Sequence, residues 1–331
     1  MRRESELGTV PNGLRPVRDA AEMPPPSPAR RMRRSDVYTR PVVDGRELRD
    51  SAATRLRDDI VELLRGKAER EELDAEMRLT AAAAAGVRRS NTVSVISPKG
   101  GVGKTTTTFL LGSALASHLR LRVLALDANP DFGTLGALAP DGWRVDRTLA
   151  DLLSDLDHVH ASSELRPYVS RLPSGLHILA APLDASAMAE MTMEAYGVLL
   201  AFLGRYYDAI LLDCGTGITD SVARFAVRRA DQVLVVSTPE FVTAQTVLAS
   251  LELLQHDRSL VVLNQAERGG GERGAIERRF GRERTGPRIA IPYDEQLRSM
   301  LDSATYSLEG LERRVRLPIK RLALAVAEGL V

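Results

Sequence analysis

The stretch Ser97-Pro98-Lys99-Gly100-Gly101-Val102-Gly103-Lys104-Thr105-Thr106 decides the fold. It follows a β-rich apolar run at residues 92–97 and opens a helical pattern at 106–118. A glycine-rich turn between a strand and a helix that ends in Lys-Thr is typical of a phosphate-binding loop. Pro98 stands at the first position, where the strict pattern has glycine. A glycine-rich turn without a ligand is the alternative, but the register of the lysine and threonine favours the phosphate loop.

The residues of this loop have distinct expected roles. Glycines let backbone N–H groups turn inward to form a nest for an anion, and the helix N-terminus adds its dipole. The Lys104 ammonium is expected to reach the β- and γ-phosphates, and the Thr105 hydroxyl to coordinate Mg²⁺. The predicted ligands are therefore ATP and Mg²⁺, with the nucleotide held by Gly100, Gly101, Val102, Gly103, Lys104, Thr105 and Thr106.

The rest of the chain alternates strand and helix patterns. Short apolar runs, separated by helical patterns, are expected to form strands at 121–127, 176–180, 208–213, 232–237, 259–263 and 288–291. Continuously apolar strands between helices are typical of a parallel sheet covered on both faces. The predicted fold is α/β, with a doubly wound, mainly parallel sheet and helices on both faces, closed by helices at 294–301 and 308–326.

Length, charge and cysteine content limit the domain organisation, the binding partners and the cellular compartment that are expected. The 331 residues suit one large α/β domain with an extension, and a net charge of +1 gives no overall attraction to nucleic acid or membrane. Cys214 is the single cysteine, which excludes an internal disulfide or a cysteine-based cluster and favours a reducing, cytoplasmic setting. Residues 1–34 contain no secretory h-region, and no apolar run reaches the roughly 18 residues of a membrane span.

Three regions are predicted along the chain. Residues 1–45 are rich in proline and arginine and are expected to be a disordered tail. Residues 46–90 are expected to be a helical extension that packs onto the main domain. Its apolar positions recur every three to four residues, and Leu73 and Met77 are expected to continue the stripe. Residues 91–331 are the predicted nucleotide-binding domain.

The segment Lys99–Thr106 resembles the deviant Walker A motif of the MinD/ParA family of ATPases, and the resemblance runs from about Thr92 to the C-terminus. In that family the extra lysine, here Lys99, crosses a dimer interface to the partner's nucleotide. The resemblance therefore implies a P-loop ATPase that forms a homodimer when it binds ATP.

Further positions match the family in order along the chain. Asp127 corresponds to a switch I aspartate, and Asp213 to the aspartate of Walker B and switch II that holds Mg²⁺ through water. A helix N-cap is the alternative role for Asp213. The resemblance also implies that Asn264, Pro292 and Asp294 lie beside the adenine.

Switch I departs from the family pattern. The chain reads Asp127-Ala128-Asn129-Pro130-Asp131, so that Asn129 stands where many members have the aspartate that positions the attacking water. An amide orients water but is a very poor proton acceptor at neutral pH. We therefore expect slow hydrolysis, with Asp131 contributing beside Lys99, Lys104 and Asp127. Switch I resembles an actinobacterial branch of the family, part of which accompanies type VII secretion. The segments Gly133-Thr134-Leu135 and Asp213-Cys214-Gly215-Thr216-Gly217 share this resemblance.

Three functions fit these residues. The first is a switch that dimerises on Mg²⁺-ATP and positions or regulates a cargo, DNA or a secretion assembly, with an unidentified protein partner. The second is a pseudo-ATPase scaffold that binds ATP with little turnover, which Asn129 favours. The third is a metabolic P-loop enzyme of the same fold. Cys214 alone excludes the iron–sulfur relatives of this fold.

Surface contacts have competing interpretations. Two arginine clusters could hold DNA phosphates nonspecifically, although a charged helix face is the commoner explanation: Arg313, Arg314 and Arg316, and Arg278, Arg279, Arg282 and Arg284. The C-terminal apolar stripe favours a helix packed in the core over a membrane anchor, because it lacks Phe and Trp. This stripe consists of Ile319, Leu322, Ala323, Val326 and Leu330.

Overall fold

The computed structural model describes residues 66–129, 133–189, 191–217, 221–254, 256–266 and 288–330. Within them, residues 66–85 are helical and precede the first strand of the sheet. The strands are β1 (Asn91–Ser97), β2 (Val123–Ala128), β3 (Ser170–Arg171), β4 (His177–Leu179), β5 (Ala209–Thr216), β6 (Gln232–Ser237), β7 (Ser259–Ala266) and β8 (Arg288–Pro292).

Helices connect most of these strands. The α-helices are α2 (Lys104–Leu119), α3 (Leu149–Ser154), α4 (Ala185–Ala189), α5 (Met193–Leu203), α6 (Ser221–Arg229), α7 (Phe241–Leu254), α9 (Glu295–Asp302) and α10 (Arg313–Ala327). Short 3₁₀ turns lie between β2 and β3: η2 (Leu135–Leu138), η3 (Asp141–Trp143), η4 (Leu156–His158) and η5 (Ser162–Leu165). The predicted last helix thus begins five residues later than expected, at Arg313.

The strands form one sheet in the order β3-β4-β2-β5-β1-β6-β7-β8. All neighbours pair in parallel except β3 and β4, which pair antiparallel at one edge. This arrangement confirms the predicted fold class. Because the strands are parallel, the loops that follow β1, β2, β5, β6, β7 and β8 meet at one edge of the sheet, which positions the candidate site.

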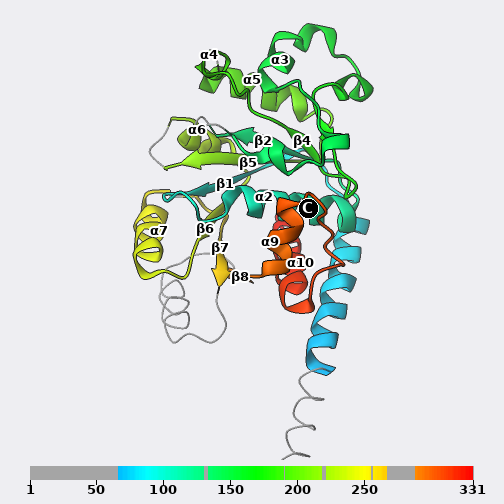
Figure 1. Cartoon of the computed structure of the whole chain (residues 1–331), viewed down its shortest axis with the longest axis vertical. Coiled ribbons are helices and arrows are strands. Elements are labelled where there is room, and N and C mark those ends of the chain that lie inside the picture. Colours follow the sequence, from blue (N-terminus) through cyan, green and yellow to red (C-terminus); the bar gives the residue numbers. More distant parts are fainter. Residues whose placement is uncertain are drawn as a thin grey trace, which may run out of the picture. The chain divides into compact units, whose positions relative to one another are not determined.

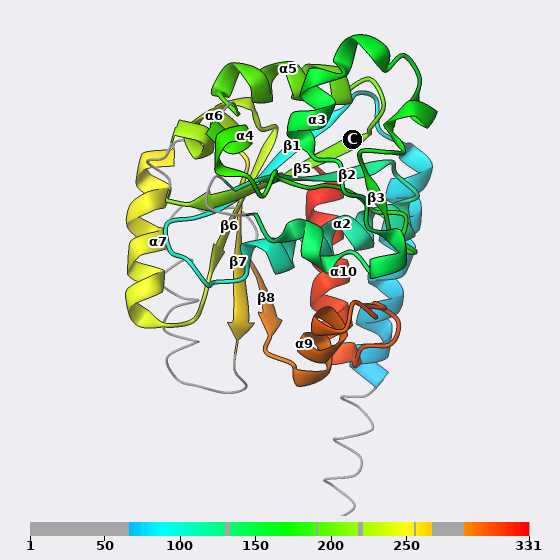
Figure 2. The same ribbon diagram turned by 45° about the horizontal axis from the view of Figure 1, so that its top comes forward.

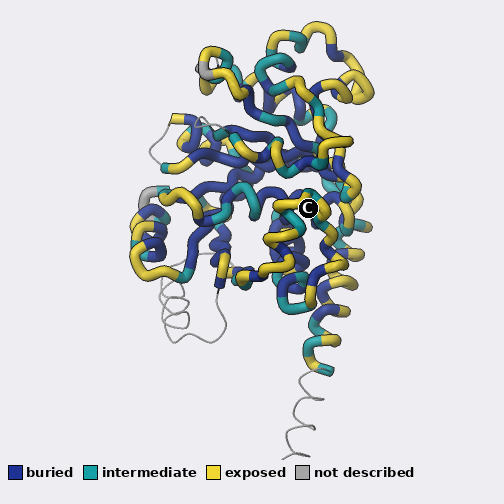
Figure 3. Tube along the Cα trace, in the orientation of Figure 1, coloured by how far each residue is buried: buried dark blue, intermediate teal, exposed yellow. Residues whose placement is uncertain are grey.

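Both faces of the sheet are buried, which explains the continuously apolar strands. Alternate residues of a strand point to opposite faces. Val123 and Ala125 thus pack under α2 and α10, whereas Leu124 and Leu126 pack under α3 and α5. Figures 1 and 2 show α2, α9 and α10 on one side of the sheet and α3, α4, α5 and α6 on the other. Figure 3 shows buried chain throughout the central strands.

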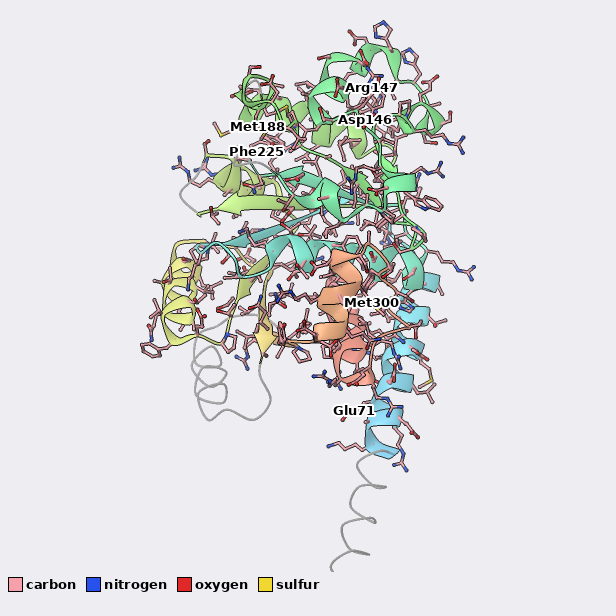
Figure 4. All side chains as sticks on the ribbon, in the orientation of Figure 1. Glu71, Asp146, Arg147, Met188, Phe225 and Met300 are labelled. Atoms are coloured by element: carbon pink, nitrogen blue, oxygen red, sulfur yellow. The ribbon has the colours of Figure 1, made fainter. Side chains whose placement is uncertain are left out.

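The helix at 66–85 packs against this domain, as expected for its part of the extension. Ala75 and Leu79 are buried. Glu71, labelled on this helix in Figure 4, pairs with Arg321 of α10 at 2.9 Å. The prediction for Leu73 and Met77 was wrong, because their side chains are 56% and 57% exposed. The helix turns its glutamates toward the arginines of α10, which places this apolar pair on the outer side. Residues 46–65 lie outside the described part of the chain.

The C-terminal stripe is part of the core. Ile319, Leu322, Ala323 and Val326 are 0% exposed, and Leu330 is 4% exposed. This confirms the prediction of a core-packing helix. Across the residues that the structure covers, no helix is both long enough and apolar enough to pass through a membrane.

The arginines at the start of α10 take part in ion pairs within the chain. Arg313 and Arg316 contact Glu72, with Nε–Oε distances of 2.8 and 2.6 Å, and Arg314 pairs with Asp294 and Glu312. A charged helix face thus accounts for this cluster. The second arginine cluster, at 278–284, lies outside the described residues.

Candidate nucleotide-binding site

The phosphate loop adopts a conformation that depends on glycine. Gly101 and Gly103 have φ of 74° and 89°, in the left-handed region that side chains other than glycine rarely adopt. Gly103 forms the N-cap of α2. A Cβ atom there would lie 2.1 Å from Nδ2 of Asn264, which donates a 2.9 Å hydrogen bond to the Val102 carbonyl oxygen. The loop is therefore held between the start of α2 and the end of β7.

Lys104 begins α2 and points into the protein. It is only 9% exposed, and burial lowers the pKa of its ammonium, whereas the nearby Asp213 carboxylate opposes this shift. Because burial disfavours the charged form of a lysine, further anionic partners would stabilise the ammonium of Lys104. The location of Lys104 at a helix N-terminus next to a glycine nest fits contact with phosphate.

Two buried carboxylates lie beside the loop. Asp127 on β2 and Asp213 on β5 are paired positions on neighbouring strands and are 0% and 1% exposed. Burial raises the pKa of Asp127 to about 6, although the backbone N–H groups of Leu135 and Asn129 donate to it at 3.0 and 3.2 Å. Burial, together with the charge of Asp127, raises the pKa of Asp213 to about 7. Two such carboxylates favour a cation between them.

The hydroxyl groups of α2 complete this arrangement. Thr105 and Thr108 donate hydrogen bonds to the Asp213 carboxylate, the latter at 3.4 Å. Asp213 lies within β5, so its described position is that of a strand residue and not of a helix cap. Carboxylate and hydroxyl oxygens are the ligands that Mg²⁺ prefers, usually with phosphate oxygens and waters. Thr105, Asp127 and Asp213 thus fit a magnesium ion that a nucleotide shares.

The described residues contain no group of three or more His, Cys, Asp or Glu side chains able to hold a metal by themselves. A cation at Asp127 and Asp213 therefore needs oxygen ligands from outside the carboxylate pair. This is the donor set expected of a magnesium ion that arrives with phosphates, and not of an all-protein metal site.

Lys99 lies at the surface of the loop. Its side chain is 46% exposed, and its Nζ donates to Glu240 Oε2 at 3.0 Å and to Thr243 Oγ1 at 2.8 Å. No role was predicted for Glu240 or Thr243 from the sequence. The turn after β6, Thr238-Pro239-Glu240, was the available signal, because it ends at the same edge of the sheet as the phosphate loop.

Gly133 belongs to the segment that resembles the actinobacterial branch, but its contact with Asp127 was not predicted. An added Cβ atom there would lie 2.1 to 2.3 Å from the Asp127 carboxyl atoms, so only glycine fits this close approach. Asn129 directly follows β2, and its backbone N–H faces Asp127. Asp131 lies outside the described residues. The structure therefore places Asn129 beside the carboxylate pair.

The three predicted adenine contacts lie at the ends of β7 and β8. Asn264 contacts the phosphate loop directly. Pro292 ends β8. Asp294 caps α9 by accepting from the Leu297 N–H at 2.9 Å, and it also pairs with Arg314. Contact of these residues with a base stays a prediction, and Asp294 has a structural role besides.

This chain is similar to a family model and to several known proteins. A family model described as an AAA domain matches residues 90–261. The ESX-1 secretion-associated protein EspI of Mycobacterium tuberculosis is 28% identical over 251 residues, which cover 73% of this chain and 37% of EspI. The antiactivator FleN of Pseudomonas aeruginosa is 33% identical over 171 residues, 51% of this chain and 58% of FleN. The matches thus span less than two thirds of the length of each of these relatives.

Solved structures share the fold. A ParA family ATPase from Chlorobium tepidum TLS superposes with a TM-score of 0.61 at 23% identity, covering 71% of this chain and 98% of that one. The septum site-determining protein MinD from Pyrococcus horikoshii OT3, solved with Mg-ADP, gives a TM-score of 0.56 at 23% identity, with coverage of 71% and 94%. At these identities the likeness establishes the fold.

Proposed function

Because this chain belongs to the MinD/ParA family of ATPases, we propose that it is a molecular switch that forms a homodimer on Mg²⁺-ATP and hydrolyses ATP slowly. The ATPase domain in this proposal is residues 91–331, with 1–45 as a tail and 46–90 as a helical extension. A cytoplasmic site of action, where ATP is available, is part of the proposal.

One observation carries the proposal. The glycine nest, the buried Lys104 and the Asp127–Asp213 pair meet at the carboxyl edge of the sheet, around a loop that β7 holds in place. Groups that can bind an anion lie on one side, and on the other lie two buried carboxylates whose mutual repulsion is only partly offset by Lys104. This is the arrangement that a magnesium nucleotide neutralises.

The residues have separate tasks in the proposed mechanism. Bound Mg²⁺ would supply charge stabilisation at the phosphates. Lys104 and the N–H groups of Gly100–Gly103 would orient the phosphate chain, and Thr105, Asp127 and Asp213 would hold the cation. Lys99 would leave Glu240 and Thr243 and extend to the nucleotide of a second copy. Its exposure and its position at the loop surface support this movement.

The proposed cellular role is action on a secretion assembly. The similarity to EspI, which is described as ESX-1 secretion-associated, supports this choice over partitioning of DNA. The paired state of Arg313, Arg314 and Arg316 also leaves fewer cations for phosphate on that face. The partner itself would be found by pull-down in the ATP state.

The test is molar mass by light scattering, first with ADP and then with Mg²⁺-ATP. The parent should double in mass with ATP alone, and Lys99→Ala should remain monomeric while still binding ATP. Lys67→Ala, which removes an exposed lysine of the helix at 66–85, is the matched control and should dimerise like the parent. A mass that is indifferent to nucleotide, with ATP bound, contradicts the switch.

A second candidate function rests on Asn129. An amide side chain in place of a carboxylate two residues after Asp127 favours a scaffold that binds ATP and turns it over very slowly. Asn129→Asp should then raise the rate of phosphate release by about tenfold or more, since a positioned carboxylate supplies general-base catalysis. Asp131→Ala separates the two readings: an unchanged rate of hydrolysis removes Asp131 from the mechanism and favours the scaffold.

A further inference from the structure

A pocket of ≈ 410 Å³ opens at the amino ends of the strands, at the edge opposite the phosphate loop. Arg122 precedes β2, His177 begins β4 and Tyr207 lies two residues before β5, and all three line it. Six residues of extended chain separate Tyr207 from Asp213, a distance of roughly 20 Å at about 3.3 Å per residue. The pocket is therefore separate from the candidate nucleotide site, and its size suits a small molecule.

The pocket carries uncompensated positive charge. Three arginines line it, of which Arg122 is already paired with Asp208, its Nη2 lying 2.5 Å from Oδ1. The guanidinium groups of Arg166 and Arg171 make no ion pair and no hydrogen bond with the part of the chain that the structure covers. No Asp or Glu is found among the described lining residues. Two cations thus face one hollow without a counter-ion.

Other lining groups offer hydroxyls and an apolar wall. Ser162 and Ser163 come from η5, and the partly exposed Tyr206 supplies an aromatic ring. Leu165 and Val169 also line the pocket, but each is only 2% exposed. Such a combination of a few polar groups and apolar side chains is typical of sites for small organic ligands. An anion with an apolar body would meet both kinds of surface here.

His177 supports this description of the electrostatics. Its Nδ1 lies 2.9 Å from the Tyr207 hydroxyl oxygen. Burial, and then the positive charge of Arg171, lower the pKa of His177 to about 4. The imidazole is therefore neutral at pH 7, and the field of Arg171 reaches into the pocket.

We propose that this pocket binds a small organic phosphate monoester, with its phosphate between Arg166 and Arg171 and its apolar body against the ring of Tyr206. A phosphate monoester carries a charge of about −1.5 to −2 at neutral pH, which matches two uncompensated arginines. Guanidinium forks bind phosphate oxygens in bidentate fashion. The proposal is independent of the proposed switch function, because it uses none of its residues.

The test is calorimetric titration of phenyl phosphate into the full chain saturated with Mg²⁺-ADP. One molecule should bind per chain. Arg166→Ala and Arg171→Ala should each weaken binding by roughly tenfold or more, as expected for the loss of a charge-assisted hydrogen bond. The double variant Arg228→Ala/Arg229→Ala is the matched control: it removes two exposed arginines at the end of α6 and should bind like the parent.

Two results would contradict the proposal directly. The first is that the parent does not bind phenyl phosphate at millimolar concentration, and the second is that the control variant loses as much affinity as the pocket variants. If benzoate bound as tightly as phenyl phosphate, the proposed preference for a phosphate group would be wrong. If inorganic phosphate bound as tightly as phenyl phosphate, the proposed apolar contact would be wrong. Dependence on Arg166 and Arg171 separates this pocket from the phosphate loop. Because both arginines are exposed, the variants should keep the parent's circular dichroism spectrum.

Discussion

Two regions of this molecule bury charged side chains, and they balance the charges in opposite ways. At the carboxyl edge of the sheet, Asp127 and Asp213 lie side by side with like charges. Between the helix at 66–85 and α10, Lys320 has a side chain that is 1% exposed and pairs with Glu76 and Glu309 at 2.7 and 3.3 Å. Glu72 lies in the same network, with Arg313 and Arg316.

The difference separates a binding site from a structural contact. Charges of opposite sign that satisfy each other attach one element to another and need no ligand. Like charges held together in the interior raise the free energy of the unliganded fold, and such pairs cluster at functional sites. The Asp127–Asp213 pair is therefore a place in the described part of the chain where a bound cation would neutralise buried negative charge.

Among the charged side chains, the largest expected effect is on the structural contact. Lys320→Ala should lower the free energy of unfolding by about 3 kcal/mol, because it removes both buried packing and one partner of a buried network. Lys320→Met keeps most of the volume and should cost about 1 kcal/mol or less. Urea unfolding measures both. Equal losses in the two variants would show that the charge matters more than the packing.

Glu72 should give a pH dependence with a defined sign. Its arginine partners, first Arg316, lower the pKa of Glu72 to about 2, so the folded state favours the ionised form. The resulting stabilisation is complete above about pH 4.5 and is lost as the pH falls toward 2. Glu72→Gln should lower the free energy of unfolding by about 2–3 kcal/mol at pH 7. The variant should also lose less stability than the parent between about pH 4.5 and pH 2. If the variant and the parent lost stability equally between about pH 4.5 and pH 2, the pairing of Glu72 with its arginines would be contradicted.

Asp213 should show the opposite sign. Its raised pKa of about 7 means that folding favours the protonated form, so stability should fall as the pH rises from about 4 to about 7. Asp213→Asn should raise the free energy of unfolding by about 1–2 kcal/mol at pH 8 without nucleotide. The same variant should lose most of the effect of Mg²⁺ on ATP affinity. Destabilisation by Asp213→Asn would show that its hydrogen bonds outweigh the repulsion.

The smallest expected effect concerns the outer side of the helix at 66–85. Leu73→Ser should change the free energy of unfolding by less than about 0.5 kcal/mol, because Leu73 is 56% exposed. Leu79→Ala on the inner side is the matched comparison and should cost about 2–4 kcal/mol, since Leu79 is 2% exposed. Thermal unfolding of the two variants tests which face of the helix contacts the domain.

Much of the candidate site could be predicted because its requirements are local. The left-handed glycines, Lys104 and Thr105 lie within the five residues 101–105, and their register against a strand and a helix is visible in a single sequence. Asp127 and Asp213 end apolar runs, and parallel pairing brings such strand ends to one edge. The contacts of Glu240, Thr243 and Gly133 were not predicted, because they involve residues far along the chain or across a turn.

By itself, the sequence determined the phosphate loop, the parallel sheet with two buried faces and the burial of the C-terminal helix, because each follows from short-range periodicity and backbone conformation. Only the tertiary structure decided the partners of the charged residues. Arg313 and Arg316 meet Glu72 across about 240 residues, Asp294 is shared between α9 and Arg314, and Arg166 and Arg171 are left facing a pocket. Which charges meet depends on how the helices dock, and no local pattern encodes that.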